Sequence, residues 1–482
     1  MTVGGAPEPA AGLLLSSSRS IGILEERGVP YEISRRELEP GLAQLGRPSG
    51  DPKLLWPTGA DGLRGAYRLG LTPLFACLAP DEKADRLLTA TNKPWRRELD
   101  IVDAAGRVVS AIRRSEDGSV FLPFDPDDAA TTLLREAYLD VTTSRFKAKA
   151  TTLARAAYYR LRPFVPRGVQ LAARRRFTRV QDYAAFPRWP VESALHDLYD
   201  FVLGLVDEIA GEPVPRLASW PDGKSWALVL THDVETAVGH GRMDAVLDVE
   251  RRKGLRSAWF FVPERDYRVA DEQVATLRSS GCEIGVHGLH HDGRDLSAPE
   301  LPRRVPAMRA WAERWGATGF RAPATHRSWE LMPKLGFDYD SSYSDVARYE
   351  PQEGGSCSWL PFFIDDLVEL PITLPMDHTL FEVLGCADGS RWHEKTAFLR
   401  ERGGMALLLT HPDYLHDGRL REYERFLEEV AGDKTAWCAL PREVSAWWRR
   451  RAASRIVPDT AGWRVEGPAA REARIEFGAS RV

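Results

Sequence analysis

The second half of the chain alternates short apolar runs with longer stretches of mixed polarity. The apolar runs are too short for helices, which is typical of buried strands. Stretches of helical character, such as 243–253 and 272–280, lie between most of them. Strands that alternate with helices predict a parallel sheet with crossover connections. The expected strands are 226–231, 258–262, 283–286, 318–320, 337–339, 367–370, 405–409 and 435–439.

This pattern predicts the α/β fold class. Repetition of the strand–helix unit through residues 222–450 predicts a (β/α) barrel that is distorted or incomplete. A smaller domain of mixed α/β structure is expected before it, over 1–140, where 100–112 has the pattern of a hairpin. Residues 141–221 are expected to form a basic helical connector, and 451–482 a C-terminal β tail.

The composition is that of an ordinary globular protein, because 43% of the 482 residues are hydrophobic and 28% are charged. Lys and Arg total 65 against 69 for Asp and Glu. This near balance argues against a general nucleic-acid binder, which needs a basic surface. Apolar runs all stay below the roughly 18 residues that a membrane-spanning helix needs, so no such helix is expected.

The cysteines and the N-terminus indicate a reducing compartment. The five cysteines are scattered and never in C-x-x-C spacing, so neither a disulfide framework nor a thiolate zinc site is expected. The N-terminal residues carry no basic region, and their apolar core is too short for a signal peptide. We therefore expect a cytoplasmic protein.

Residues 145–190 are rich in lysine and arginine, interspersed with apolar and aromatic residues. One hypothesis is an amphipathic segment that contacts anionic lipid and attaches the protein peripherally to a membrane. The alternative, which we favour, is a solvated helical connector that packs on the next domain. The sequence indicates no oligomeric state.

Polar residues suited to catalysis lie directly after the expected strands. Ten of the eleven histidines lie between His232 and His416. Catalytic groups of a parallel barrel gather at the C-terminal ends of its strands. Four segments have this placement: THDVE (231–235), HGLHHD (287–292), RAPA (321–324) and THPD (410–413). Carboxylates, imidazoles and an arginine are thus expected at one rim.

His287 and His291 indicate a metal site. Imidazole is a common zinc ligand, and two histidines four apart converge where a loop turns helically. Two histidines and one carboxylate leave coordination positions open, as catalytic sites require. Asp233 and Glu235 lie two apart on an extended segment and so face the same side, one as ligand and the other as general base. A structural histidine pair and a surface Asp-Val-Glu turn are the alternatives.

Five motifs, in this order, resemble those of the polysaccharide deacetylase family, which includes chitin, peptidoglycan and nodulation-factor deacetylases. HDVE (232–235) resembles the family's T-F-D-D-G, HGLHH (287–291) its H-[ST]-x-x-H, and RAPA (321–324) its R-x-P-[YF]. DSSY (340–343) resembles the fourth motif and LTH (409–411) the fifth, L-x-H. The resemblance covers residues 222–450, about half of the chain.

The resemblance implies roles for single residues. His287 and His291 would bind one divalent metal ion, zinc by preference, with cobalt, nickel or manganese as alternatives. Asp233 matches the family's general base, and Arg321 would hold that base by an ion pair.

The remaining motifs imply the acid and the acyl pocket. His411 would be the general acid, with Asp340 orienting it. Leu409 would line the pocket for the acyl methyl group, and the backbone N–H of Ala324 would help an oxyanion hole. His378, after the sixth expected strand, is a further candidate for touching the substrate, with a plain loop histidine as the alternative.

Two departures from the family pattern matter. The family's metal-binding second aspartate is Val234 here, which has no ligand atom. Either Glu235 is the third ligand and Asp233 the base, which we favour, or Asp233 binds the metal and Glu235 is the base. The aromatic residue that follows the third-motif proline is Ala324 here, which removes one wall of a polymer-binding groove.

Together these inferences predict a hydrolase acting on a non-peptide C–N bond, a carbohydrate N-deacetylase. The expected substrate is an N-acetylated (N-acyl) amino sugar in a small glycoside, a nucleotide-linked sugar or a lipid-linked saccharide, because a cytoplasmic enzyme does not meet extracellular polymers. Two alternatives stay open. One is an amidohydrolase acting on a small non-sugar amide; the other is a degenerate domain that binds saccharide without hydrolysis, which Val234 would favour.

Overall fold

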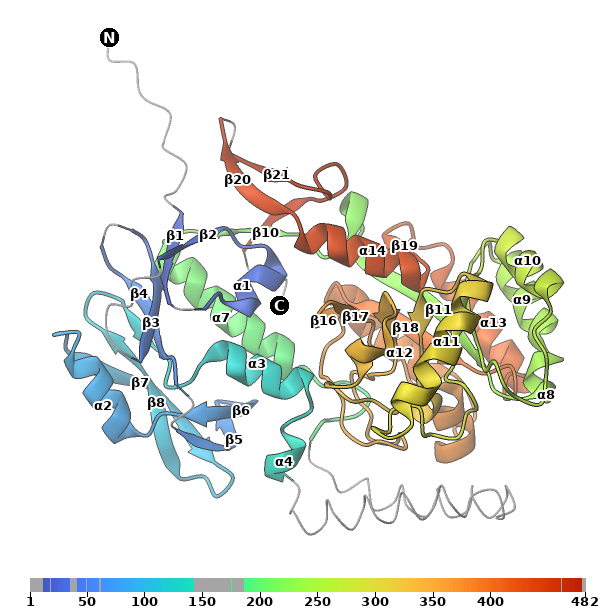
Figure 1. Cartoon of the computed structure of the whole chain (residues 1–482). Helices are drawn as coiled ribbons and strands as arrows, with labels where there is room; N and C mark the ends of the chain where they lie inside the picture. The colour runs from blue at the N-terminus through green and yellow to red at the C-terminus, as the bar shows by residue number, and fades with distance from the viewer. Residues whose placement is uncertain are drawn as a thin grey trace. The chain divides into compact units, whose positions relative to one another are not determined.

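The chain falls into two compact units (Figure 1). The first comprises Met1–Arg145, Ser193–Gly223 and Arg450–Val482, and the second comprises Phe146–Glu192 and Lys224–Arg449. The computed structural model describes residues 12–17, 19–34, 41–48, 50–59, 62–142, 175, 186–460 and 462–478. Most of the basic segment 145–190 lies outside these residues.

The first unit is built on a mixed nine-stranded sheet with strand order β2-β1-β3-β4-β9-β8-β7-β5-β6. Its strands are β1 (Leu13–Ser16), β2 (Tyr31–Ser34), β3 (Leu42–Gly46), β4 (Lys53–Pro57), β5 (Leu63–Leu69), β6 (Thr72–Leu78), β7 (Trp95–Asp103), β8 (Val108–Ser115) and β9 (Val120–Phe121). Its helices are α1 (Gly22–Arg27), α2 (Asp81–Thr89), α3 (Pro126–Leu134), α4 (Leu139–Thr142) and α7 (Ala194–Ala210). Two strand pairs also belong to it: β10 (Pro215–Leu217) with β22 (Ile475–Phe477), and β20 (Arg455–Asp459) with β21 (Gly462–Glu466).

Helix α7 illustrates how the sequence builds this unit. Leu195, Leu198 and Val202 recur at helical spacing and are buried, and the helix contacts β3, β4, β6 and α3. It ends at Gly211, whose φ of 73° is the left-handed conformation that glycine adopts freely. The amphipathic face of α7 therefore covers part of the first sheet.

The second unit holds the other nine-stranded sheet, a half-barrel with strand order β16-β17-β15-β14-β13-β12-β11-β18, in which β19 also pairs with β11. All its neighbouring strands are parallel except β16 and β17. The strands are β11 (Trp226–Val234), β12 (Ala258–Phe261), β13 (Glu283–Val286), β14 (Gly319–Phe320), β15 (Tyr339–Asp340), β16 (Phe362–Ile364), β17 (Leu367–Glu369), β18 (Met405–Thr410) and β19 (Ala436–Cys438).

Helices surround these strands (Figure 1). They are α8 (Ala237–His240), α9 (Met243–Arg252), α10 (Asp271–Ser279), α11 (Leu301–Trp315), α12 (Ser390–Glu401), α13 (Gly418–Val430) and α14 (Pro441–Ala452), with a π-helical segment at His378–Leu384 and short 3₁₀ turns at Pro323–Thr325 and Met332–Leu335. A further 3₁₀ turn, Pro221–Gly223, belongs to the first unit. α10 and α11 contact β13, and α12 contacts β18. All nine residues of β11 are buried, as expected for a central parallel strand covered on both faces.

The parallel half-barrel agrees with the α/β class and the distorted barrel expected from sequence. The grouping of segments differs from the expected four-part division, because the tail strands β20–β22 and helix α7 belong to the first unit. Strand β22 pairs with β10, more than two hundred residues earlier in the chain, and such a pairing leaves no local sequence signal.

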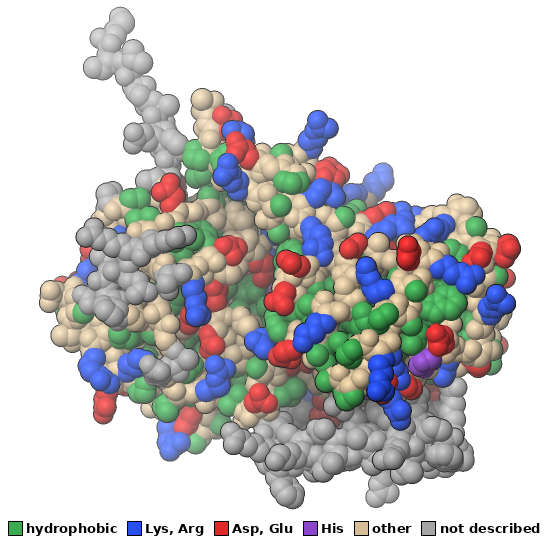
Figure 2. Space-filling model, viewed as in Figure 1, with side chains coloured by type: hydrophobic (Ala, Val, Ile, Leu, Met, Phe, Trp, Pro, Cys, Tyr) green, Lys and Arg blue, Asp and Glu red, His purple; other side chains and the backbone are tan. Residues whose placement is uncertain are grey.

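The surface of the described residues mixes both signs of charge, since Figure 2 shows lysine and arginine side chains interspersed with acidic ones over the face in view. Within the described part of the chain, we find no helix with the length and hydropathy needed to cross a bilayer.

Candidate active site

Strand β11 sends alternate side chains to opposite faces. Thr231 Oγ1 and Asp233 Oδ1 both accept hydrogen bonds from the guanidinium of Arg321, at 2.9 Å and 3.1 Å. His232 lies on the other face, where its ring bonds to Glu250 and Thr410 at 2.6 Å and 2.8 Å. Glu235 follows the strand on the same side as Asp233, so two carboxylates reach one face, as the i, i+2 spacing predicts.

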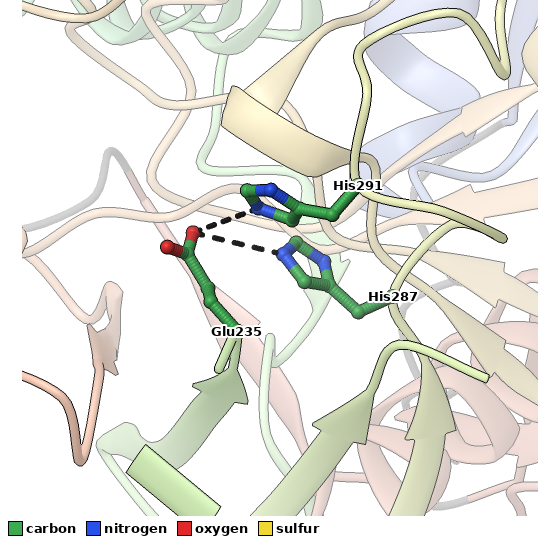
Figure 3. A group of neighbouring side chains, drawn as sticks. All are labelled: Glu235, His287 and His291. Carbon is green, nitrogen blue, oxygen red and sulfur yellow. Dashed lines mark hydrogen bonds and ion pairs between the residues drawn. The ribbon is translucent and has the colours of Figure 1, made fainter. Parts of the chain in front are cut away.

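Glu235, His287 and His291 form a cluster whose ligand atoms all lie within 4.8 Å of one another (Figure 3). Glu235 Oε1 is 2.9 Å from His291 Nε2 and 4.0 Å from His287 Nε2. Both rings point toward the Glu235 carboxylate from the loop that follows β13 (Figure 3). Among the described residues, these three are the ones whose arrangement could hold a metal ion.

The backbone of this loop is fixed at both histidines. The His287 N–H donates to the Phe261 carbonyl at 2.7 Å, which continues the β12–β13 ladder. Gly288 and His291 both have left-handed backbones, with φ of 65° and 55°. A histidine adopts that region uncommonly, so the surrounding structure must hold the loop in place.

The donor set fits a divalent metal of the zinc type. His287 Nδ1 lies 3.1 Å from the Arg321 carbonyl oxygen, which can only accept, so Nδ1 carries the proton and Nε2 presents its lone pair. That Nε2 is buried and has no hydrogen-bond partner. A buried, unsatisfied imidazole nitrogen beside a second imidazole and a carboxylate is the arrangement that catalytic zinc sites use.

Asp233 is held by a buried ion pair with Arg321. The Arg321 side chain is fully buried, donates to the carbonyl oxygen and the hydroxyl of Ser341 at 2.7 Å and 2.8 Å, and lies over the Phe260 ring at 4.6 Å. Asp233 Oδ2 is 3.6 Å from His287 Nε2. The guanidinium therefore fixes one carboxylate oxygen, and the other faces the metal-ligand cluster.

His411 follows β18 and is bound twice by Asp377. The His411 N–H donates to Asp377 Oδ2 at 2.8 Å, and the ring Nδ1 bonds to Oδ1 at 2.7 Å. Burial alone would lower the pKa of His411, but the charge and hydrogen bond of Asp377, with the charges of Glu235 and Asp233, raise it to about 10. His411 is therefore a protonated imidazole at neutral pH, with Nε2 3.8 Å from Glu235 Oε1.

The Glu235 carboxylate stays ionised in this setting. Burial would raise its pKa, but the charge and hydrogen bond of His291 and the charge of His411 hold the pKa well below its usual range. An ionised carboxylate is the form that binds a cation.

Asp340, expected to orient His411, does not contact it. Its carboxylate accepts from the N–H and the hydroxyl of Ser342, both at 2.9 Å, and Ser342 Oγ accepts from the Ala322 N–H at 2.8 Å. Burial raises the pKa of Asp340 to about 6, and burial together with the Asp340 charge raises that of its strand neighbour Glu369 well above its usual range. Asp340 thus supports the loop of Arg321. The carboxylate that contacts His411 is that of Asp377.

Asp377 has the same placement after an expected strand as the other candidate residues, but it is in none of the five motifs. Asp377 follows the expected strand 367–370 and directly precedes His378, the residue expected there to touch the substrate. In the structure the His378 N–H donates to Asp377 Oδ1, and the His378 ring lies 5.1 Å from that of Tyr414. His378 therefore lies next to the acid–carboxylate pair, outside the ligand cluster.

The other candidate residues from the sequence lie near the same ends of the parallel strands. Leu409 is buried and pairs in register with Thr231. Ala324 has a left-handed φ of 56° in the turn after Arg321. His290, between the two ligand candidates, points instead to Glu264 at 3.4 Å, and 41% of its side chain is exposed.

Comparison with known proteins adds a likeness in fold. No protein-family model matches the chain, and no curated protein matches it in sequence. Among solved structures, a protein from Mycobacterium smegmatis described as a polysaccharide deacetylase is 22% identical, with a TM-score of 0.39, over 48% of this chain and 93% of its own. A second such protein, from Pseudomonas aeruginosa PAO1, is 18% identical, with a TM-score of 0.35, over 47% of this chain and 92% of its own.

Over about half of the chain, the fold resembles that of solved structures described as polysaccharide deacetylases. These are the proteins that the five motifs predicted the chain would resemble. An allantoinase shares the likeness, with 19% identity and a TM-score of 0.36 over 48% of this chain and 92% of its own. At these identities and TM-scores the likeness carries no argument about activity, which has to rest on the side chains of the site.

Proposed function

We propose that this chain is a metal-dependent hydrolase that removes an N-acyl group, acetyl by preference, from an amino sugar. The observation that supports it most is the convergence of three sets of groups at one edge of the sheet. These are the cluster of Glu235, His287 and His291, the Asp233–Arg321 ion pair and the His411–Asp377 pair. Metal ligands, a general base and a general acid are what hydrolysis of an unactivated amide needs.

Each group has a distinct task in the proposed reaction. A divalent ion held by Glu235, His287 and His291 would lower the pKa of bound water and polarise the amide carbonyl. Asp233 takes the proton of the attacking water through Oδ2, because Arg321 occupies Oδ1. The backbone N–H of Ala324 donates to the developing oxyanion.

His411 completes the cycle as general acid. An amine leaves poorly as an anion, so a proton must reach the nitrogen as the C–N bond breaks. His411 holds that proton on Nε2, since Nδ1 is bonded to Asp377. The products are acetate and a free amino sugar.

The proposed substrate is a small glycoside, a nucleotide-linked sugar or a lipid-linked saccharide. Ala324 stands where the related motif has an aromatic residue, and a methyl group offers little surface for stacking a sugar ring. A long polymer laid along an aromatic groove therefore fits this site less well than a short saccharide.

The experiment pairs metal content with acetate release. We expect wild-type protein to hold about one divalent ion per chain by mass spectrometry and to release acetate from N-acetylated saccharides. The double variant His287→Ala/His291→Ala loses both. His290→Ala, which changes the exposed histidine between them, keeps both.

Two outcomes would contradict the proposal. Wild-type protein that binds no ion after incubation with zinc, cobalt or nickel argues for a saccharide-binding domain without hydrolysis. Protein that binds the ion but cleaves only small ureide or acyl-amine substrates argues for an amidohydrolase outside carbohydrate chemistry.

A further inference from the structure

The loop that carries both metal-ligand histidines is tied to α11 by a single arginine. Arg304, in the first turn of that helix, donates from Nη1 to Asp292 Oδ1 at 2.6 Å and from Nη2 to Asp292 Oδ2 at 2.7 Å. Nη1 also donates to Asp295 Oδ1 at 2.9 Å. One guanidinium thus holds two carboxylates of the loop 287–295, in the two-pronged geometry that arginine alone supplies.

Each of these carboxylates is adjacent to a ligand histidine. Asp292 directly follows His291, whose left-handed φ of 55° needs support from its surroundings. Asp295 packs against Gly288, the residue after His287, so closely that a Cβ on Gly288 would overlap Asp295 Oδ2. Arg304 therefore anchors the loop next to both of its ligands.

Burial makes this anchor rigid. The Arg304 side chain is 9% exposed and that of Asp295 is 2% exposed, whereas Asp292 reaches the surface at 34%. A charge buried at that level is stable only while its partners stay in place, so the three groups hold one another. The loop conformation is then fixed before any ion arrives, which lowers the cost of binding.

We propose that Arg304 is the positioning residue that sets the metal affinity of the His287–His291 loop. The inference rests on the proposed metal site and names a determinant that none of the five motifs contains. Arg304 touches neither ligand, and it acts on them through Asp292 and Asp295.

The test is the zinc dissociation constant of the apo protein, measured by competition with a chromogenic chelator. Arg304→Lys keeps the positive charge but cannot form the two-pronged bond to Asp292. We expect the zinc dissociation constant of this variant to rise about tenfold or more. Arg303→Lys, the matched control one residue away on the same helix, has a side chain that is 79% exposed and is expected to stay within twofold of wild type. Near-UV circular dichroism of each apo variant reports whether the fold is intact.

Arg304→Gln separates positioning from simple electrostatics. Removing a positive charge near a cation site should tighten zinc binding if charge alone matters. If Arg304 positions the ligands, the same change weakens binding instead. Tighter binding in this variant would overturn the proposal.

A second link keeps the test decisive if the Arg304 variants fail to fold. Asp292→Asn breaks the two-pronged bond from the carboxylate side, which is 34% exposed, and is expected to weaken zinc binding about tenfold. Glu300→Gln removes an equal charge beside Arg304, at 3.6 Å from Nε, without touching the loop, and serves as the control.

The possible failures are distinguishable. Wild-type protein that binds no zinc overturns the proposed metal site and this inference together. Wild-type protein that binds zinc, with folded Arg304→Lys and Asp292→Asn variants that bind it equally well, overturns only the role of Arg304.

Discussion

At the scale of single residues, two carboxylates two positions apart serve different purposes because their neighbours differ. Asp233 faces a guanidinium, and Glu235 faces three imidazoles, those of His287, His291 and His411. The additional methylene of glutamate extends its carboxylate past the end of β11 to the histidines. The proposed division into base and ligand follows from these surroundings.

The Asp377 carboxylate should set the alkaline limit of activity. In Asp377→Asn the pKa of His411 falls from about 10 toward its ordinary value, because the charge that favours the imidazolium is gone. The acid is then lost at lower pH, so the alkaline limb of the kcat/KM profile moves down by about one to three pH units. The measurement is kcat/KM against pH on the metal-loaded enzyme.

Asp340→Asn is the contrasting variant, because Asp340 was the partner expected from the motifs. It reduces activity through the Arg321 loop but leaves the alkaline limb where it is. An alkaline limb that moves in Asp340→Asn and stays in Asp377→Asn would reverse the assignment.

Residues at strand ends were predictable from the sequence, and their orienting partners were not. His287, His291, Arg321 and His411 follow apolar runs directly, so a parallel sheet must bring them to one edge. Asp377 reaches His411 through the turn that follows β17, and the path of a turn is set by tertiary packing. The same limit applies to Arg304, which stands in an ordinary helix.

At the scale of elements, one buried carboxyl connects two strands and a helix of the second unit. Glu283 on β13 accepts from the Tyr339 hydroxyl at 2.6 Å and from the Arg442 N–H at 3.0 Å. β14 lies between β13 and β15, so the Tyr339 ring must cross it, and it does so over Gly319, where a Cβ would overlap the ring. Glycine is required there for this close approach.

Stability should therefore depend on pH through Glu283. Burial raises the pKa of Glu283 to about 7, from an ordinary value of 4.5. Between these values the folded state binds more protons than the unfolded state, so wild-type stability falls as pH rises, by about 3 kcal/mol over the interval. Glu283→Gln removes this titration. Its amide oxygen can still accept from the Arg442 N–H, and its amide nitrogen can donate to the Tyr339 hydroxyl oxygen.

Urea unfolding at pH 5 and pH 8 measures the effect. We expect the free energy of unfolding of the variant to lie below that of wild type at pH 5. At pH 8 most of this difference is expected to disappear. Parallel pH dependences for the two proteins would show that the folded state keeps Glu283 ionised.

The positions of most strands were predictable because apolar runs and turn residues mark them locally. The order of the strands in the sheet was harder to predict from the sequence. β18 and β19 both return to β11, which is the first strand of the sheet, and only long-range pairing decides this. β14 and β15 consist of two residues each, too few for any pattern to fix their ends.

At the scale of the whole molecule, every residue of the proposed site belongs to the second unit. Binding stabilises the state that binds, so zinc should protect that unit from local opening. Hydrogen–deuterium exchange with and without zinc measures this. Peptides that cover 233–240, 287–295 and 409–414 are expected to exchange more slowly with zinc.

Peptides from 62–142, in the first unit, are expected to stay unchanged. The His287→Ala/His291→Ala variant should show no zinc-dependent protection at all. Protection confined to the first unit, or equal in wild type and variant, would place zinc binding elsewhere in the chain.

The alternation along β11 has a consequence for how this chain can vary. Positions 231, 233 and 235 carry the groups that meet Arg321 and the histidines, whereas His232 meets Glu250 on the other side. Inserting one residue before Thr231 would leave the composition of the segment intact yet exchange its two sides. The His232 imidazole and the Val234 isopropyl group would then face Arg321 and the histidines, and both carboxylates would face the buried Glu250. A substitution at one of the positions 231–235 thus changes one side chain, whereas a change in length before Thr231 exchanges the two sides of the whole segment in a single event.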